Sequence, residues 1–246
     1  MHIEILGDAK AVGRAAAEAG AAVIREALAR QDHVDIIVAT GASQFDLLEV
    51  LVAAPDIDWS RITAFHLDEY IGLPVSHGAS FRRYLHERFV ARLPKLGAFI
   101  DVVGDATDIR GELDRLNGLI GPRTIEVCFA GIGENGHLAF NDPPADFDTT
   151  EPYIVVDLDE ACRRQQIGEG WFPDMAAVPT QAISMSIHQM LAARTLIITV
   201  PGPKKTAAVA ASLDGPLTPD VPASILRRHG DCRIFLDPAS SAGLKR

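Results

Sequence analysis

The sequence predicts an α/β fold with a mostly parallel central sheet, and two observations lead to this prediction. Short apolar runs recur along the 246-residue chain, and most of them are continuous rather than alternating with polar residues. Continuous runs are typical of strands that are buried on both faces of a parallel sheet. Segments with helical periodicity separate these runs, and alternating strands and helices favour parallel pairing through right-handed crossovers.

Six strands are expected, each rich in large aliphatic or β-branched residues. They cover residues 3–6, 34–40, 61–67, 125–133, 195–200 and 232–237. In open parallel sheets, ligands bind beyond the carboxyl ends of the strands. The turns that follow these strands are therefore the first places in which to look for a functional site.

The clearest helix is expected at 11–31, where alanines, leucines and spaced charges form an amphipathic pattern. Further helices are expected at 45–54, 80–93, 111–120 and 203–213. The least regular region is 141–182, which is rich in Pro, Asp and Gly. Loops of this length in a compact domain are usually functional or mobile, so we expect this region to cover the site as a lid. The chain lacks repeats and long linkers, which predicts a single domain over 1–246.

The composition argues against several classes of protein. The chain is 48% apolar and 23% charged, and its net charge of −10 disfavours a general nucleic-acid or membrane-surface binder. Its 3 cysteines are widely spaced without a C-x-x-C pair, which suits a reducing compartment better than a disulfide framework. The N-terminus becomes charged too early for a signal peptide, and no apolar run approaches the length of a membrane span. We expect a cytoplasmic protein with neither nucleic-acid nor membrane partners.

The stretch 125–144, IEVCFAGIGENGHLAFNDPP, carries the most information. Its glycines spell G-x-G-x-x-G after an expected strand, and an acidic residue, Asp157, follows at a distance that suits a dinucleotide site. Such a site needs a helix whose N-terminus meets the pyrophosphate, and Pro143 and Pro144 follow too soon for one. We therefore interpret the stretch as a tight turn that presents His137.

The neighbours of His137 suit proton transfer. Asn135 precedes it, and Asp142 follows in the same turn. An imidazole beside a carboxylate can move a proton near neutral pH, with its orientation fixed by the partner. The alternative is a structural histidine. The metal-binding patterns H-x-H and H-E-x-x-H do not occur, so neither a metal nor another cofactor is expected.

A second polar turn, Thr40-Gly41-Ala42-Ser43, joins the strand at 34–40 to the following helix. Small residues at such a turn expose backbone N–H groups that can bind an anion. The alternative is an ordinary helix N-terminus that is capped by Ser43.

Two further strand ends carry charged residues. Asp68 closes the strand at 61–67 and is a candidate general base if it faces the cleft and Glu69 does not; the alternative is a solvated acidic pair. Lys204 and Lys205 follow the strand at 195–200. A glycine turn with lysines that opens a helix suits a phosphate clamp, and it also suits a solvated surface turn.

Taken together and in this order, these segments resemble the glucosamine-6-phosphate deaminase family, part of a larger group that includes 6-phosphogluconolactonases. The matching segments are ATGAS at 39–43, FHLDEYIGLPVSHGASFRRYLHERF at 65–89, GIGENGHLAFNDP at 131–143 and VPTQAISMSIHQMLAARTLIITVPGPKK at 178–205. LDEY-x-GL and GHLAFN are specific to the deaminase branch, whereas the lactonase branch typically has DER and GHTAS there. The resemblance implies a Rossmann-like three-layer sandwich.

The resemblance also implies a reaction, which converts an amino-sugar 6-phosphate to fructose 6-phosphate and ammonia. Asp68 would move the C2 proton to C1 through an enolamine, and His137 would assist opening of the sugar ring. Thr40, Gly41, Ala42, Ser43 and Lys205 would hold the phosphate of this small-molecule partner. A proton transfer between adjacent carbons needs one well-placed base, and neither a redox cofactor nor an obligatory metal. Relatives occur as monomers and as hexamers, so the resemblance leaves open whether this chain forms a homo-oligomer.

Two catalytic positions depart from the family pattern. Asn135 stands where the family usually has Asp, and Asp142 stands where it usually has Glu. An asparagine can orient an imidazole through its carbonyl, but it cannot stabilise imidazolium charge as a carboxylate does.

The family also uses an arginine to bind phosphate, and the alignment places Glu169 or Gly170 at that position. Arg163 and Arg164 lie nearby and are the candidates to replace it. The alternative functions are a 6-phosphogluconolactonase or a sugar-phosphate isomerase on the same fold, or a sensor that binds a sugar phosphate without catalysis.

Overall fold

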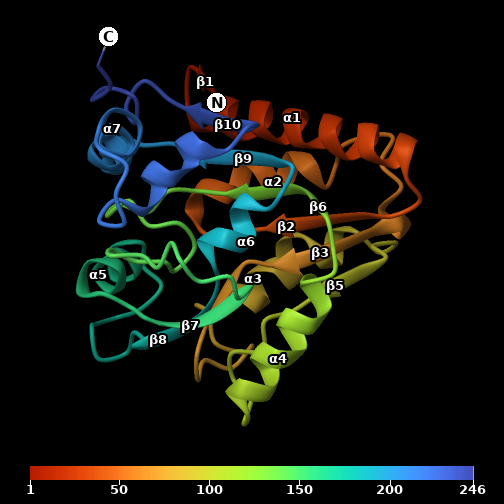
Figure 1. The fold of residues 1–246 in the computed structure, drawn as a ribbon, viewed down its shortest axis with the longest axis horizontal. Coiled ribbons are helices and arrows are strands. Elements are labelled where there is room, and N and C mark those ends of the chain that lie inside the picture. The colour runs from red at the N-terminus through yellow and green to blue at the C-terminus, as the bar shows by residue number, and fades with distance from the viewer. Residues whose placement is uncertain (246) are drawn as a thin grey trace.

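A seven-stranded sheet runs through the centre of the molecule (Figure 1). The computed structural model describes residues 1–245. The strands follow the order β1 (His2–Ile5), β10 (Cys232–Leu236), β9 (Thr195–Val200), β6 (Ile125–Ala130), β2 (Val34–Val38), β3 (Ile62–His66) and β5 (Ala98–Ile100). Every neighbouring pair is parallel. The predicted parallel sheet and its six predicted strands are confirmed, and β5 was missed because it has only 3 residues.

Helices cover both faces of this sheet, which makes a Rossmann-like three-layer sandwich, as predicted. The helices α1 (Ala9–Arg30), α2 (Phe45–Leu51) and α3 (Phe81–Arg88) share one apolar core, and α4 (Ile109–Ile120), α6 (Ile187–Leu191) and α7 (Thr206–Asp214) share the other. Strand side chains alternate between the two cores. In β6, Phe129 faces α1 while Cys128 and Ala130 face the opposite core. This burial on both faces explains why the strands are continuously apolar.

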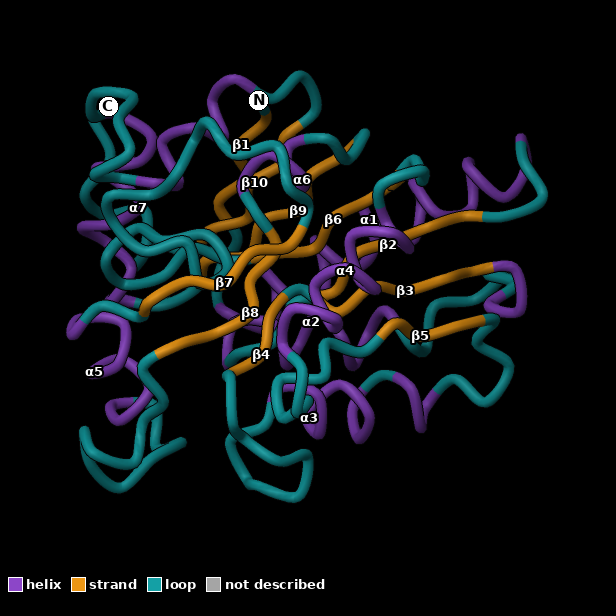
Figure 2. The backbone as a smooth tube through the Cα atoms, turned by 60° about the horizontal axis from the view of Figure 1, so that its bottom comes forward, coloured by secondary structure: helices purple, strands orange, loops and turns teal. Residues whose placement is uncertain are grey.

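A second, antiparallel sheet of three strands was not predicted (Figure 2). It contains β4 (Asp68–Tyr70), β8 (Gln181–Met185) and β7 (Tyr153–Asp157) in that order. Only Leu67 separates β3 from β4, and its backbone hydrogen-bonds to Val38 on one side and Met185 on the other. The small sheet therefore begins where β3 ends, and this junction fixes the position of Asp68.

The region 141–182 is more regular than the sequence analysis predicted. It contains β7, the start of β8 and a helix, α5 (Glu160–Gly168). A third apolar cluster lies beneath it, in which the ring of Tyr70 packs against the rings of Phe140 and Phe172. The aromatic cluster anchors the region, so it is not an unstructured loop.

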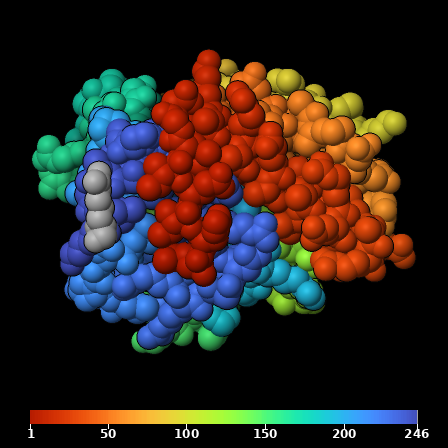
Figure 3. Space-filling view, turned by 90° about the horizontal axis from the view of Figure 1, so that it is seen from above, coloured from red at the N-terminus to blue at the C-terminus, as the bar shows by residue number. Residues whose placement is uncertain are grey.

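The two ends of the chain meet at one edge of the central sheet. β1 pairs with β10, and the space-filling view shows N-terminal and C-terminal residues forming one continuous surface (Figure 3). Across residues 1–245, no helix has both the length and the apolar character needed to cross a membrane.

The close contact between α1 and β6 yields a test of the packing. A Cβ atom at Gly20 of α1 would lie 2.2 Å from a ring carbon of Phe129. We expect Gly20→Ala to lower the free energy of unfolding by about 1–3 kcal/mol, because overpacking outweighs the better helix propensity of alanine. Gly118 of α4 is exposed and has open space around it, so Gly118→Ala should instead add about 0.5–1 kcal/mol. Urea denaturation measures both, and a stabilised Gly20→Ala protein would contradict the packing.

Candidate active site

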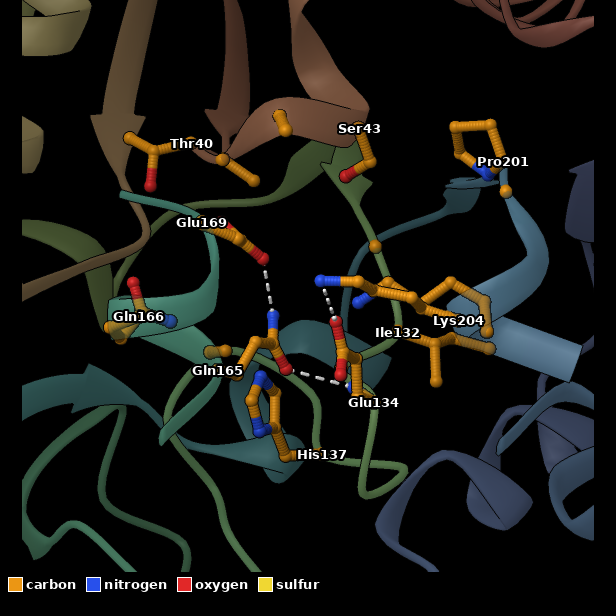
Figure 4. Close-up of a pocket in the computed structure, with 18 of the residues that line it drawn as sticks. Thr40, Ser43, Ile132, Glu134, His137, Gln165, Gln166, Glu169, Pro201 and Lys204 are labelled. Atoms are coloured by element: carbon orange, nitrogen blue, oxygen red, sulfur yellow. Dashed lines mark hydrogen bonds and ion pairs between the residues drawn. The ribbon is translucent and has the colours of Figure 1, made fainter. Parts of the chain in front are cut away.

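A cavity of about 470 Å³ lies at the carboxyl ends of four adjacent strands of the central sheet (Figure 4). The turns that follow β2, β3, β6 and β9 all contribute to its wall, and α5 of the region 141–182 contributes a further part. The lining residues are Ala9, 39–43, 67–68, Phe81, 131–134, His137, 139–140, 165–166, Glu169 and 201–205. The structure thus brings the predicted turns together in one cavity.

The turns after β2 and β9 have the same backbone design. Each contains a glycine with positive φ, Gly41 at 94° and Gly202 at 98°, followed by a short 3₁₀ turn and a helix. A residue with a side chain rarely adopts this φ, which accounts for glycine at both positions. Among the described residues, no side chain caps the helix after either turn, so Ser43 does not act as the predicted alternative N-cap. The backbone N–H groups of Gln44 and Lys205 close the two turns by donating to the carbonyls of Gly41 and Gly202, and the N–H of Gly202 donates to Asp237.

Lys205 lines the cavity at the turn after β9. Burial lowers the pKa of its ammonium group, while the carboxylates of Glu169 and Glu134 act in the opposite direction. Its neighbour Lys204 is exposed and forms an ion pair with Glu134, in which Nζ lies 3.8 Å from Oε1. The cavity therefore holds one partly buried cation beside the two glycine turns.

Asp68 and Glu69 have opposite environments although they are adjacent. The Glu69 carboxylate accepts hydrogen bonds from the Ser80 hydroxyl and from the backbone N–H groups of Tyr70, Phe81 and Arg82, which fix it at the start of α3. Asp68 lines the cavity, and its carboxylate has no hydrogen-bond partner within residues 1–245. The condition for a candidate general base is therefore met, because Asp68 faces the cavity and Glu69 does not.

The position of Asp68 also changes its acidity. Burial raises the pKa of this carboxyl well above its usual value, and the negative charge of Glu69 raises it further. A carboxylate with a raised pKa is a stronger base once it has lost its proton. Perturbed carboxyl groups in cavities mark candidate sites of proton transfer.

His137 forms a pair with Asp142. Its Nδ1 lies 2.9 Å from Oδ1 of Asp142, and both side chains are almost completely buried. Burial alone would raise the pKa of Asp142, but hydrogen bonds from His137 and Asn135 reverse the effect and lower it. The outer edge of the imidazole contacts Gly133, where a Cβ atom would lie 2.3 Å from Nε2. The G-x-G-x-x-G turn therefore serves to seat the histidine, and residues 131–144 contain no helix of the kind that a dinucleotide site requires.

Asn135 does not line the cavity but connects the groups behind His137. Its Oδ1 accepts a hydrogen bond from the backbone N–H of His137. Its Nδ2 donates to two carboxylates, at 3.0 Å to Asp142 and 3.2 Å to Asp159. An aspartate at this position would place three carboxylates side by side, so the structure explains why this chain has an amide here.

Two cavity residues of α5, Gln165 and Gln166, were missed by the sequence analysis, which named Glu169, the residue after the helix, only for its alignment. Gln165 Nε2 donates to Glu169, while its Oε1 accepts the backbone N–H of Glu134, so these residues form a connected chain across the cavity (Figure 4). Gln166 is buried, and within the described part of the chain its Oε1 has no hydrogen-bond partner. An N-cap aspartate at 159 before a helical pattern was a signal for α5 that the Pro and Gly content of the region obscured.

Neither arginine candidate lines the cavity. Arg163 donates to the backbone carbonyls of Met175 and Val178, and Arg164 pairs with Glu160 on the surface. Glu169, one of the two residues aligned with the family's arginine position, does line the cavity. This part of the wall is therefore acidic, where the family pattern predicts a cation.

His137, Asp142 and Cys162 bring one ligand atom each to within 4.8 Å of one another, as a metal site would. In the structure the histidine and the carboxylate already hydrogen-bond to each other, and burial raises the pKa of the Cys162 thiol. A metal ligand must be a thiolate, so this environment favours the hydrogen-bonded pair over metal binding. Cys128, Cys162 and Cys232 are all buried free thiols.

Comparison with known proteins agrees with this geometry. Residues 7–234 match the family described as glucosamine-6-phosphate isomerases/6-phosphogluconolactonase, and the chain belongs to this family. A glucosamine-6-phosphate deaminase of Latilactobacillus sakei is 34% identical over 92% of this chain and 94% of its own length. One from Streptococcus agalactiae is 33% identical over 84% of this chain and 86% of its own.

Two solved structures superimpose on almost the whole of this chain. A monomeric glucosamine-6-phosphate deaminase superimposes with a TM-score of 0.88 at 26% identity, over 99% of this chain and 100% of that one. The 6-phosphogluconolactonase of Thermotoga maritima superimposes with a TM-score of 0.77 at 16% identity, over 96% of this chain and 99% of that one, which supports the shared fold.

The contacts of Asn135 can be tested by two substitutions. Asn135→Ala removes two donors from carboxylates, and we expect it to lower the free energy of unfolding by about 2 kcal/mol. Asn135→Asp also adds a like charge, and we expect a larger loss, about 3 kcal/mol or more at pH 7. Urea denaturation at neutral pH separates the two. An aspartate variant as stable as the alanine variant would mean that the carboxylates of Asp142 and Asp159 do not face this position.

Proposed function

We propose that this protein is an amino-sugar-phosphate deaminase, which converts an amino-sugar 6-phosphate and water to a ketose 6-phosphate, fructose 6-phosphate in the case of glucosamine 6-phosphate, and ammonia. The observation that carries the proposal is that the Asp68 carboxylate faces the same cavity as His137, whose imidazole is paired with Asp142. The family and the deaminase relatives support the same reaction. The cavity, of about 470 Å³, has the size of a small-molecule site.

The phosphate would bind between the two glycine turns. Thr40, Gly41, Ala42 and Ser43 offer backbone N–H groups and hydroxyls, and Lys205 supplies a cation from the opposite turn. Backbone N–H groups in such turns form concave anion sites. The carboxylates of Glu169 and Glu134 favour the charged form of Lys205, which keeps the ammonium available when the phosphate arrives.

Ring opening would come first, because the C2 proton becomes acidic only in the open-chain aldehyde form. Neutral His137 would take the proton of the C1 hydroxyl and then deliver it to the ring oxygen as the bond between C1 and that oxygen breaks, which returns the histidine to its starting state. The hydrogen bond from Nδ1 to Asp142 leaves Nε2 as the nitrogen that exchanges protons with the ligand. Asp142 fixes the ring orientation and stabilises the imidazolium, and Asn135 holds the backbone beneath it.

Asp68 would then take the proton from C2 and return it to C1. The first transfer gives an enolamine, and the second gives a ketimine at C2. Water adds to the ketimine and ammonia leaves, so one molecule of water is consumed for each ammonia released. One carboxylate suffices for both transfers because C1 and C2 are adjacent, and Asp68 is not tied to protein donors in residues 1–245.

The surroundings of the site fit a small anionic sugar as the partner. The three buried free thiols of the protein suit a reducing compartment, which supports our expectation that the protein works in the cytoplasm. The acidic charge of the chain as a whole gives no support for a nucleic-acid ligand. We further propose that the region 141–182 covers the bound sugar, since Gln165 and Gln166 of α5 and Glu169 directly after it line the cavity.

The experiment is a substrate screen. The protein is incubated with the 6-phosphates of glucosamine, galactosamine and mannosamine and with 6-phosphogluconolactone, and ammonia and ketose are measured together. We expect equal amounts of both from at least one amino sugar. Ketose without ammonia would indicate an isomerase, hydrolysis of the lactone alone would indicate a lactonase, and binding without turnover would indicate a sensor; each of these outcomes refutes the proposal.

Asp68→Asn provides a test with two readouts. We expect it to abolish ammonia release, and His137→Gln to reduce the rate about 100-fold. Asp68→Asn should also raise the melting temperature. The folded state holds the Asp68 proton more tightly than the unfolded chain does. The free energy of unfolding therefore falls as the pH rises through the raised pKa of Asp68. The whole of this loss is present at pH 7 if that pKa lies below 7. One pKa unit corresponds to about 1.4 kcal/mol and therefore to about 3–5 °C.

Asp114→Asn is the matched control, since Asp114 is exposed on α4 and its neutralisation should change the melting temperature by about 1 °C or less. Full activity in the Asp68→Asn protein, or a melting temperature that falls, would refute the role and the environment assigned to Asp68.

The pH dependence of turnover follows from the same carboxyl. Asp68 accepts a proton only when it is ionised, so kcat should fall as the pH drops through its raised pKa, well above the value of about 4 for an ordinary aspartate. The measurement is kcat at saturating substrate, which avoids the titration of the sugar phosphate. An acid limb at or below about pH 4, or the same limb in the residual activity of Asp68→Asn, would contradict the assignment.

A further inference from the structure

We propose that Asp159, the first residue before α5, is a positioning residue for His137, so that docking of α5 over the cavity holds the catalytic imidazole in place. The inference rests on the proposed function for the identity of the catalytic residue. Asp159 lies outside the cavity wall and would act only through other side chains.

The connection runs through the carboxylate of Asp142. Its Oδ1 receives two hydrogen bonds from the turn at 131–142, one from His137 Nδ1 and one from Asn135 Nδ2. Its Oδ2 receives a third from the backbone N–H of Asp159, at 3.0 Å. The third donor belongs to the N-cap residue of α5 and not to the histidine turn. The rotation of the Asp142 carboxylate therefore depends on where the start of α5 lies.

The side chain of Asp159 makes a second connection. Its Oδ1 accepts the backbone N–H of Cys162 as the helix N-cap, and its Oδ2 accepts the Asn135 amide at 3.2 Å. Asn135 in turn accepts the backbone N–H of His137. One carboxylate therefore ties the start of α5 to the residue that supports the catalytic turn.

The other end of α5 faces the cavity. Gln165 accepts the backbone N–H of Glu134, and Gln166 and Glu169 line the wall where a sugar would bind. The helix is thus attached to the histidine turn at both ends, and Figure 4 shows the attachment through Gln165 and Glu134. A ligand that contacts α5 would stabilise the docked helix and, through Asp159, the orientation of the imidazole.

Two substitutions remove this tie while they keep the helix cap. Asp159→Asn keeps an oxygen for Cys162 but presents an amide donor to the Asn135 donor, and Asp159→Ser caps the helix with a side chain that is too short to reach Asn135. Glu160→Gln is the matched control. It neutralises the next acid of the same helix, which is exposed and pairs only with Arg164 among the residues that the structure describes.

The first measurement is proton NMR of the ligand-free protein, which follows the downfield signal of the His137 Nδ1 proton and requires no turnover. We expect this signal to broaden or disappear in both Asp159 variants and to persist in Glu160→Gln. The second measurement is steady-state kinetics on the best amino-sugar phosphate. We expect kcat to fall about tenfold in both Asp159 variants with KM changed by about twofold or less.

Two results would overturn the proposal. One is an unchanged Nδ1 signal in folded Asp159 variants, and the other is a rise in KM with kcat retained, which is what a merely loosened α5 would produce. Melting temperatures identify any variant that fails to fold, and the second Asp159 variant then provides the result. Because the NMR measurement is independent of catalysis, a protein that releases no ammonia would refute the proposed function and still allow this test.

Discussion

The parallel alignment of β3, β2, β6 and β9 is the constraint on which the site depends. Parallel strands finish at the same edge of a sheet, so the turns that follow them are brought together whatever their separation in sequence. Each turn contributes a different chemistry, namely backbone N–H groups after β2, a carboxylate after β3, an imidazole after β6 and a cation after β9. The apolar cores on both faces hold these strand ends rigidly.

The site also depends on how differently two adjacent carboxylates are treated. Glu69 receives four hydrogen bonds and stabilises the start of α3, whereas Asp68 is left without protein donors in the described residues. Burying a carboxyl without a partner lowers the free energy of unfolding, and the packing of the surrounding sheets must offset this cost. The same burial raises the pKa of Asp68, which would give it the basicity that the proposed proton abstraction from carbon requires.

Much of the fold could be predicted from the sequence, and the missed elements share a physical cause. The long strands were found because burial on both faces makes them continuously apolar. β4 and β5 have only 3 residues each, and β7 exposes part of one face, so none of them has a clear pattern. α5 was missed because it lies in a segment whose Pro and Gly content indicates a loop, and its two buried residues, Cys162 and Gln166, give only a weak apolar stripe.

The candidate site was predicted to a similar extent. Asp68, His137 and the glycine turns at Gly41 and Gly202 follow strands, where position alone indicates a candidate role. The wall formed by α5 and the links of Asn135 to Asp142 and Asp159 could not be predicted, because they join segments that only the tertiary structure brings together. The prediction that Arg163 replaces the family's phosphate-binding arginine met the same limit. Arg163 lies on α5, but it donates to backbone carbonyls away from the cavity.

The three buried thiols lie in two different parts of the fold. Cys128 and Cys232 lie in strands of the central sheet, whereas Cys162 lies in α5, and all are buried. A thiol reagent can reach the first two only when the sheet itself opens, but it can reach Cys162 when α5 alone leaves its place. Alkylation of Cys162 would therefore report local opening, while the sheet cysteines report global unfolding. Cys162 would thus be a built-in reporter of the opening of α5, the helix that contributes Gln165 and Gln166 to the cavity wall.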